Sequence, residues 1–177
     1  MRYRHQRGRN GHKRTLAAII DSFRDVHRAF GFGYREYIYS LAMERDLIAK
    51  GCRVDREVGV MVYYRGEPLA PQRVDMIVNE RVIVDNKATE RLRADTPSQL
   101  FSYLCSTNIE VGLVLHFGRE PRFYRVVCEN RFKLRPKQHC EQRTSPRLCP
   151  FHSVFARIQM VRCEQGARTG RMTQLPQ

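Results

Sequence analysis

The chain has 177 residues, of which 42% are hydrophobic and 28% charged, and its formal net charge is +14. This length predicts one ordinary domain with tails. The sequence contains no apolar run of the roughly 20 residues that span a bilayer, and its N-terminal segment lacks the apolar core of a secretory signal. We therefore expect a cytoplasmic protein with no membrane partner.

The positive charge is concentrated at the two ends of the chain. Residues 1–14 contain six Lys or Arg and no acidic residue, and residues 131–177 contain ten Lys or Arg and two acidic residues. The composition predicts a disordered basic arm over 1–14, a charge-balanced domain over 15–130 and a poorly ordered basic extension over 131–177. Such ends either add salt-dependent affinity for phosphates or only keep the protein in solution.

Stretches of helical and strand periodicity alternate along the chain. In chain order we expect a helix at about 15–30, a helix from about 34 to Lys50 that stops at Gly51, strands at about 54–64, around Asp75 and around Asp85, a helix beginning at Thr96, and strands at about 111–117 and 122–128. The predicted fold class is α/β (α+β), a mixed sheet flanked by helices.

Two acidic motifs stand on the two strands that the Asn79-Glu80 turn joins. Asp85 and Lys87 lie two apart and share one face of their strand, and Asp75 on the neighbouring strand can reach the same place. Carboxylates hold a hard cation, and a cation and a lysine together stabilise charge on phosphoryl oxygens. The motifs therefore suit phosphodiester hydrolysis, although a charged strand face exposed to solvent has the same pattern.

Three more polar residues are candidates for this site. Glu36, bracketed by Gly33 and Tyr39 as G-x-x-E-x-x-Y, falls in the first turn of the second helix. It is either a helix-terminal acid favoured by the macrodipole or a third acidic ligand. Gln99 and Tyr103 lie four apart on the third helix, where they either form a polar stripe or orient a water or a phosphate oxygen.

The acidic motifs belong to a longer ordered series. It comprises Val26-His27, Gly33, Glu36 and Tyr39, residues 62–66, 73–75 and 82–88, Gln99-Leu100, Tyr103-Leu104, residues 111–115 and Phe117-Gly118. In this order and spacing, residues 15 to about 128 resemble the GxxExxY protein family, a branch of the PD-(D/E)xK nuclease-like superfamily. The resemblance implies a restriction-endonuclease-like αβββαβ core. Val74 stands where the superfamily name has proline, and Asp85 where this branch more often has glutamate.

The resemblance also implies an activity and a set of site residues. We expect a Mg²⁺- or Mn²⁺-dependent nuclease, a hydrolase acting on nucleic acid and on DNA rather than RNA. Asp75, Asp85 and the backbone carbonyl of Asn86 would hold the cation, with Glu36 joining through water. Lys87 would be a base or an electrostatic clamp, and a base would need a lowered pKa. The expected catalytic residues are Glu36, Asp75, Asp85, Lys87, Gln99 and Tyr103.

Other interpretations stay open or are disfavoured. The domain could be a non-catalytic nuclease-fold module that binds nucleic acid or a protein partner, or part of a larger toxin or defence complex. Intact signature residues favour catalysis over the first alternative. The six cysteines form no Cys-x-x-Cys pair, which predicts reduced thiols. A zinc site is disfavoured because its candidate ligands match no compact finger; these are His139, Cys140, Cys149, His152 and Cys163.

Overall fold

A computed structural model describes residues 4–133 and the segment 159–162. Its elements are α1 (Arg4–Phe30), α2 (Glu36–Ala49), β1 (Val54–Tyr64), β2 (Glu67–Val78), β3 (Val82–Lys87), α3 (Thr96–Cys105), β4 (Val111–His116), β5 (Arg122–Val127), a 3₁₀ turn η1 (Asn130–Phe132) and β6 (Gln159–Arg162). None of the helices in these described ranges is long and apolar enough to cross a membrane.

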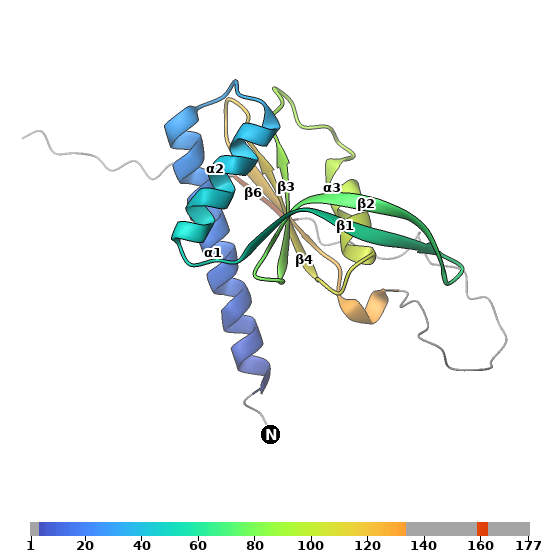
Figure 1. Cartoon of the computed structure of the whole chain (residues 1–177). Helices are drawn as coiled ribbons and strands as arrows, with labels where there is room; N and C mark the ends of the chain where they lie inside the picture. The colour runs from blue at the N-terminus through green and yellow to red at the C-terminus, as the bar shows by residue number, and fades with distance from the viewer. Residues whose placement is uncertain (1–3, 134–158, 163–177) are drawn as a thin grey trace, which may run out of the picture.

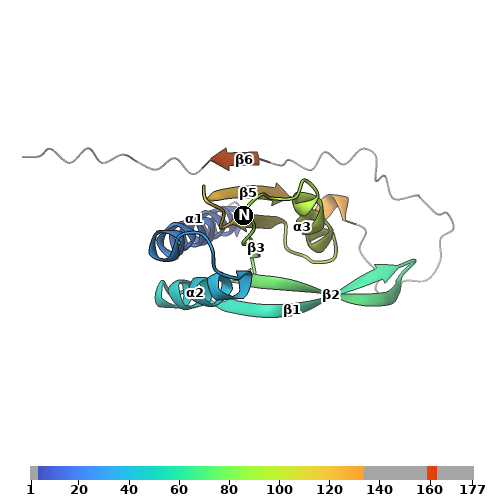
Figure 2. The ribbon, with the colours of Figure 1, turned by 90° about the horizontal axis from the view of Figure 1, so that it is seen from above.

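The strands form one mixed sheet in the order β1-β2-β3-β4-β5-β6. Among the strands that the structure describes, only β3 and β4 pair in parallel, with α3 as the crossover between them, and the other pairs are antiparallel. Viewed from above, α1 and α2 cover one face of the sheet and α3 covers the other (Figure 2). The predicted α+β class and the αβββαβ order from α2 to β4 are confirmed.

The first helix is longer than the sequence predicts. α1 begins at Arg4, so residues 4–14 are helical where their basic composition predicts disorder. Once the apolar turns of 15–30 have formed, each further residue adds a backbone hydrogen bond without a new nucleation cost, and Arg, Lys and Gln are good helix formers. Of the predicted C-terminal extension, the structure describes only residues 131–133 and β6, and the rest lies outside the described residues.

Two hydrophobic clusters hold the helices to the sheet. On one face, α1 buries Ile19, Phe23 and Val26, and the Tyr39 ring of α2 stacks on Phe117 at a centroid distance of 4.3 Å. On the other face, α3 packs against residues of β3, β4 and β5 through its two buried leucines, Leu100 and Leu104. The sheet is thus the middle layer of three, with a hydrophobic cluster on each face.

The β2–β3 hairpin turns at Asn79-Glu80, as predicted. Both residues have positive φ, 53° and 55°, which suits a turn whose twist matches the strands. The paired register runs from Val78↔Val82 to Met76↔Val84 and then stops. Beyond that point β2 leaves β3 and continues with β1 as a two-stranded hairpin that projects from the domain (Figure 1). The strand separation begins at Asp75.

Candidate active site

The C-terminal end of β3 brings together three of the predicted site residues. Asp85 and Lys87 share the face that packs under α3, as their spacing predicts, and the Lys87 Nζ donates a 2.7 Å hydrogen bond to Asp85 Oδ1. The same Nζ lies 4.0 Å from Glu36 Oε1. The Asp85 side chain is 2% exposed and that of Glu36 is 42% exposed. The group therefore runs from a buried carboxylate through an ammonium to a carboxylate in contact with solvent.

Asp75 joins this group where β2 separates from β3. Its Oδ2 accepts a 2.9 Å hydrogen bond from the backbone N–H of Asn86, in place of the strand pairing that has ended. The N–H and C=O of one strand residue point to the same neighbouring strand, so the Asn86 carbonyl also points toward Asp75. The structure thus places the carbonyl predicted as a ligand on the side of the predicted carboxylate.

The turn before α2 sets the position of Glu36. Gly33 has φ 130°, a conformation that a side chain disfavours. The buried Tyr39 hydroxyl donates to the Gly31 carbonyl at 2.8 Å and accepts from the Tyr34 N–H at 3.3 Å. The glycine and tyrosine of the G-x-x-E-x-x-Y motif therefore fix the turn that aims the glutamate at β3.

Ser40 is a positioning residue that the sequence does not single out. Its hydroxyl donates to the Glu36 carbonyl at 3.1 Å and accepts from the Asn86 side-chain amide at 2.9 Å. This chain of bonds ties the first turn of α2 to β3. The only signal in the sequence is that Ser40 lies four residues after Glu36, one helical turn away.

The electrostatics of the site are dominated by burial. Desolvation raises the pKa of Asp85 to about 7, and the neighbouring charges of Asp75 and Glu36 add to it, while the Lys87 ammonium opposes it. Burial also raises the pKa of Glu36, opposed by Lys87 and by a hydrogen bond from the Ala88 backbone N–H. Three carboxylates crowd one ammonium, which leaves an unbalanced negative site.

Lys87 is held as an ammonium. Burial alone would lower its pKa, but the hydrogen bond to Asp85 and the charges of Asp85, Glu36 and Asp75 outweigh burial and raise the pKa of Lys87. Of the two roles that the sequence leaves open, the base needs a lowered pKa and the clamp does not. The direction of the shift favours the clamp.

α3 contributes the two remaining predicted residues. Gln99 and Tyr103 lie one helical turn apart on α3, as their four-residue spacing predicts. Burial raises the pKa of the Tyr103 phenol, and the carboxylates of Asp85 and Asp75 raise it further, so α3 turns this ring toward the site. Gln99 is exposed, which leaves its amide open to a ligand.

The donor set fits one hard cation. Asp85 Oδ2 is buried and has no hydrogen-bond partner within the described part of the chain, although its other oxygen is taken by Lys87. Over residues 4–133 and 159–162, no three His, Cys, Asp or Glu side chains converge as a ready-made metal cage. Mg²⁺ matches such a site, because it keeps several waters and takes only one or two carboxylates.

The histidines have structural roles. The His27 Nε2 bonds the Gly118 carbonyl at 2.9 Å and ties α1 to the β4–β5 turn. His116 is buried at the end of β4. The candidate zinc ligands between His139 and Cys163 lie outside the described residues.

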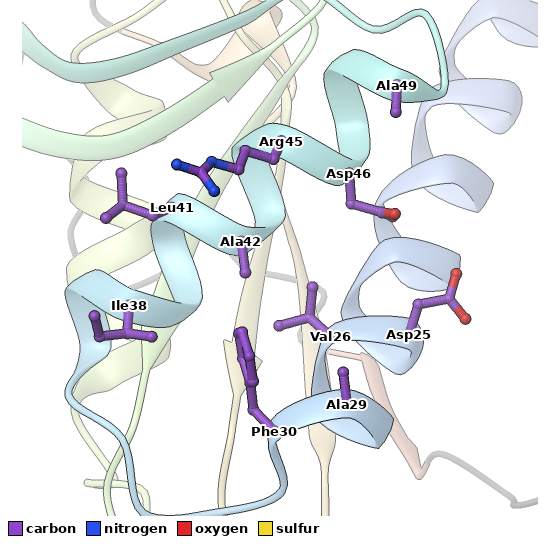
Figure 3. A pocket seen from close by; sticks show the side chains of 10 residues that line it. All are labelled: Asp25, Val26, Ala29, Phe30, Ile38, Leu41, Ala42, Arg45, Asp46 and Ala49. Atoms are coloured by element: carbon purple, nitrogen blue, oxygen red, sulfur yellow. The ribbon is translucent and has the colours of Figure 1, made fainter.

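A separate apolar cavity of about 660 Å³ lies between α1 and α2, and its lining does not include Glu36, Asp75 or Asp85. Figure 3 shows its lining, in which Val26 and Phe30 of α1 and Ala42 of α2 lie between the two helices. Its charged residues stand at the rim; among them Asp25 and Asp46 are both paired with Lys50. Both carboxylates of its lining are thus engaged by a lysine.

In a comparison with known families, the profile of the PD-(D/E)XK nuclease superfamily aligns with residues 13–126. Neither the curated proteins nor the solved structures compared with the chain contain a match. The matched span begins within α1 and ends within β5, and it contains α2, the strands β1 to β4 and α3. The superfamily prediction is confirmed, and the GxxExxY branch stays a prediction.

Proposed function

The chain belongs to the PD-(D/E)XK nuclease superfamily, and on this premise we propose that it is a metal-dependent nuclease that hydrolyses phosphodiester bonds in nucleic acid, with DNA preferred to RNA. The observation that carries the proposal is the Asp85 carboxylate. It is buried among two other carboxylates, and one of its oxygens is left without a partner in the described residues. Lys87 pairs with the other oxygen, but one ammonium among three carboxylates leaves a negative excess, and burying such a charge is unfavourable unless a further cation compensates it.

The cation would be held by Asp85 Oδ2, by Asp75 and by the Asn86 carbonyl, with Glu36 bound through water. When bound, it supplies positive charge to the phosphoryl oxygens and lowers the pKa of a coordinated water. The chain keeps these donors in place through the Asn86 N–H bond to Asp75 and the Ser40 bonds to Asn86 and Glu36. Rigid support of this kind reduces the reorganisation that the reaction would otherwise require.

Lys87 would stabilise charge on a non-bridging phosphate oxygen as an ammonium. Its raised pKa keeps the proton on Nζ, and its 20% exposed side chain lies between the buried Asp85 and the open side of the site. Tyr103 and Gln99 would hold a water or a backbone phosphate from the α3 side.

The direct test is a cleavage assay with purified protein on single-stranded DNA, double-stranded DNA and RNA, each in Mg²⁺, Mn²⁺ or EDTA. We expect cleavage of DNA that requires a divalent ion and stops in EDTA. Absence of cleavage on every substrate by correctly folded protein contradicts the proposal.

A thermal-shift measurement separates the enzyme from a non-catalytic binding module. A cation that binds only the folded state stabilises it according to its concentration relative to Kd. We expect Mg²⁺ to raise the Tm of the wild type and of Asp25→Asn, but not of Asp85→Asn. Asp25 is a suitable control because its exposed carboxylate pairs with Arg28 and Lys50, away from β3. Equal gains in all three proteins contradict cation binding at Asp85.

A further inference from the structure

A row of polar side chains extends from Lys87 across the sheet. In the strand register, Lys87 of β3 pairs with His116 of β4, and His116 pairs with Arg122 of β5. All three belong to the face under α3, because they alternate with residues of the opposite cluster such as Leu115 and Phe123. Neighbouring strands lie about 4.8 Å apart, which places Arg122 about 10 Å from Lys87 along this row.

The far end of the row opens into a cavity of about 450 Å³. Three arginines, Arg91, Arg119 and Arg122, line it together with His116 and Tyr124. Its two carboxylates are already engaged: Glu90 lies 3.6 Å from Arg119, and Glu120 lies 2.5 Å from Arg122. The lining therefore keeps a positive excess next to a site that is itself crowded with carboxylates.

His116 supports the wall of this cavity. Its ring is 5% exposed, and because a carbonyl only accepts, the 2.7 Å contact to the Thr89 carbonyl places the proton on Nε2. This bond holds the loop that carries Arg91. A Cβ at Gly118 would lie 2.7 Å from the His116 ring, so the glycine is needed for the ring to fit. The buried Nδ1 has no hydrogen-bond partner among the described residues.

We propose that this cavity is a phosphate subsite, which binds a second phosphate of the strand whose scissile phosphate lies at Lys87. The inference rests on the proposed nuclease function and adds the direction in which the strand runs, from β3 toward β5. Guanidinium groups bind phosphate oxygens through paired, planar hydrogen bonds. The ion pairs of Arg119 and Arg122 are exposed, with side chains 76% and 44% accessible, so they hold these arginines only weakly.

The test measures binding of a labelled single-stranded oligonucleotide over a range of salt concentrations, in EDTA to prevent metal-dependent cleavage. Each lost phosphate contact makes the plot of log K against log salt shallower by about 0.7 for a single strand. For Arg122→Ala we expect a lower affinity and a slope that is shallower by this amount. The double variant Arg91→Ala/Arg122→Ala should change the slope by about twice as much, and Arg122→Lys should leave the slope unchanged. Unaltered melting temperatures establish that the variants fold.

Arg53→Ala is the matched control. Arg53 is exposed and paired with Glu80, as Arg122 is with Glu120, and its removal lowers the net charge equally. Arg53 directly precedes Val54, and the strand register places Val54 beside Val78 and Val78 beside Val82. Val82 is the first residue of β3 and Lys87 is the last, so Arg53 lies at the opposite end of the sheet from Lys87. Wild-type slopes for Arg53→Ala support a local site. Equal changes in Arg53→Ala and Arg122→Ala, or no change in either, overturn the subsite.

Oligonucleotides with a 5′-phosphate, a 3′-phosphate or hydroxyl ends distinguish the two sources of phosphate. A loss in Arg122→Ala confined to one phosphorylated end identifies a terminal monoester, and an equal loss on all three identifies an internal diester; both support the subsite. Because binding is measured without cleavage, the result is independent of the activity test. If the wild type cleaves but Arg122→Ala binds as tightly as the wild type, only the subsite proposal is overturned. If the wild type binds the oligonucleotide but never cleaves it, only the proposed nuclease activity is overturned.

Discussion

The Asp75 carboxylate accepts the backbone N–H of Asn86 at 2.9 Å, at the position where β2 and β3 stop pairing. One side chain thus closes the end of a strand ladder and lines the candidate active site. A residue with both roles cannot be tested by truncation alone, because loss of the bond and loss of the ligand occur together.

Two substitutions of Asp75, one that removes the acceptor oxygen and one that keeps it, separate its structural role from its role as a ligand. Asp75→Ala leaves the Asn86 N–H without its acceptor, and we expect a loss of about 1 to 3 kcal/mol in the free energy of unfolding. Asp75→Asn keeps an acceptor oxygen and should lose less, yet it should lose metal-dependent cleavage as fully as the alanine variant. Urea denaturation in EDTA measures the first effect. Equal destabilisation by both substitutions contradicts the bond's role.

Lys87→Ala should reduce the cleavage rate by about 10² to 10³, the usual effect of removing one group that stabilises transition-state charge. Lys50→Ala is the control, since Lys50 is also a partly exposed, ion-paired lysine but pairs with Asp25 and Asp46 on α1 and α2. Rate constants under single-turnover conditions make the comparison. A Lys87 variant no slower than the Lys50 variant removes Lys87 from the mechanism.

The stability of the metal-free protein should fall as the pH rises toward neutrality. Burial raises the pKa of Asp85 from 3.8 to about 7, so the folded state keeps a proton that the unfolded state has already released. The stability that this group contributes is full below about pH 4 and is lost as pH passes through about 7. In EDTA we expect the wild type to lose on the order of 2 kcal/mol between about pH 5 and pH 8 relative to Asp85→Asn. Parallel pH profiles for the two proteins are the contrary result.

The close contact of α3 with the sheet depends on Gly112. A Cβ at this position would lie 2.8 Å from the Leu100 side chain, and Leu100 is fully buried. Gly112→Ala should therefore cost about 1 to 3 kcal/mol in thermal or chemical unfolding. Gly59→Ala, on a strand position with open space around it, should stay within about 1 kcal/mol of the wild type. If the two variants lose similar amounts of unfolding free energy, Leu100 can move aside at little cost, and the prediction is wrong.

Much of this site is predictable from local pattern. Alternation along β3 puts Asp85 and Lys87 on one face, the Asn79-Glu80 turn sets Asp75 beside them, and helical spacing pairs Gln99 with Tyr103. Each of these relations depends on residues close in sequence, or on one tight turn.

The features that escape the sequence depend on long-range packing. The pairing of β2 with β3 ends after Met76↔Val84, and no local signal in the sequence marks this point. The Ser40–Asn86 bond joins residues 46 apart, and the row from Lys87 to Arg122 exists only once β4 and β5 are in register. The added turns of α1 also depend on context, because their composition alone predicts disorder.

The most direct test of the central claim is the rate of Mg²⁺-dependent DNA cleavage by Asp85→Asn, measured beside Asp25→Asn and the wild type. The substitution keeps the shape of the side chain and removes the buried charge that would hold the cation. We predict that Asp85→Asn cleaves no faster than the EDTA control, while Asp25→Asn cleaves at the wild-type rate. Cleavage by Asp85→Asn at the wild-type rate would contradict a catalytic cation at the end of β3.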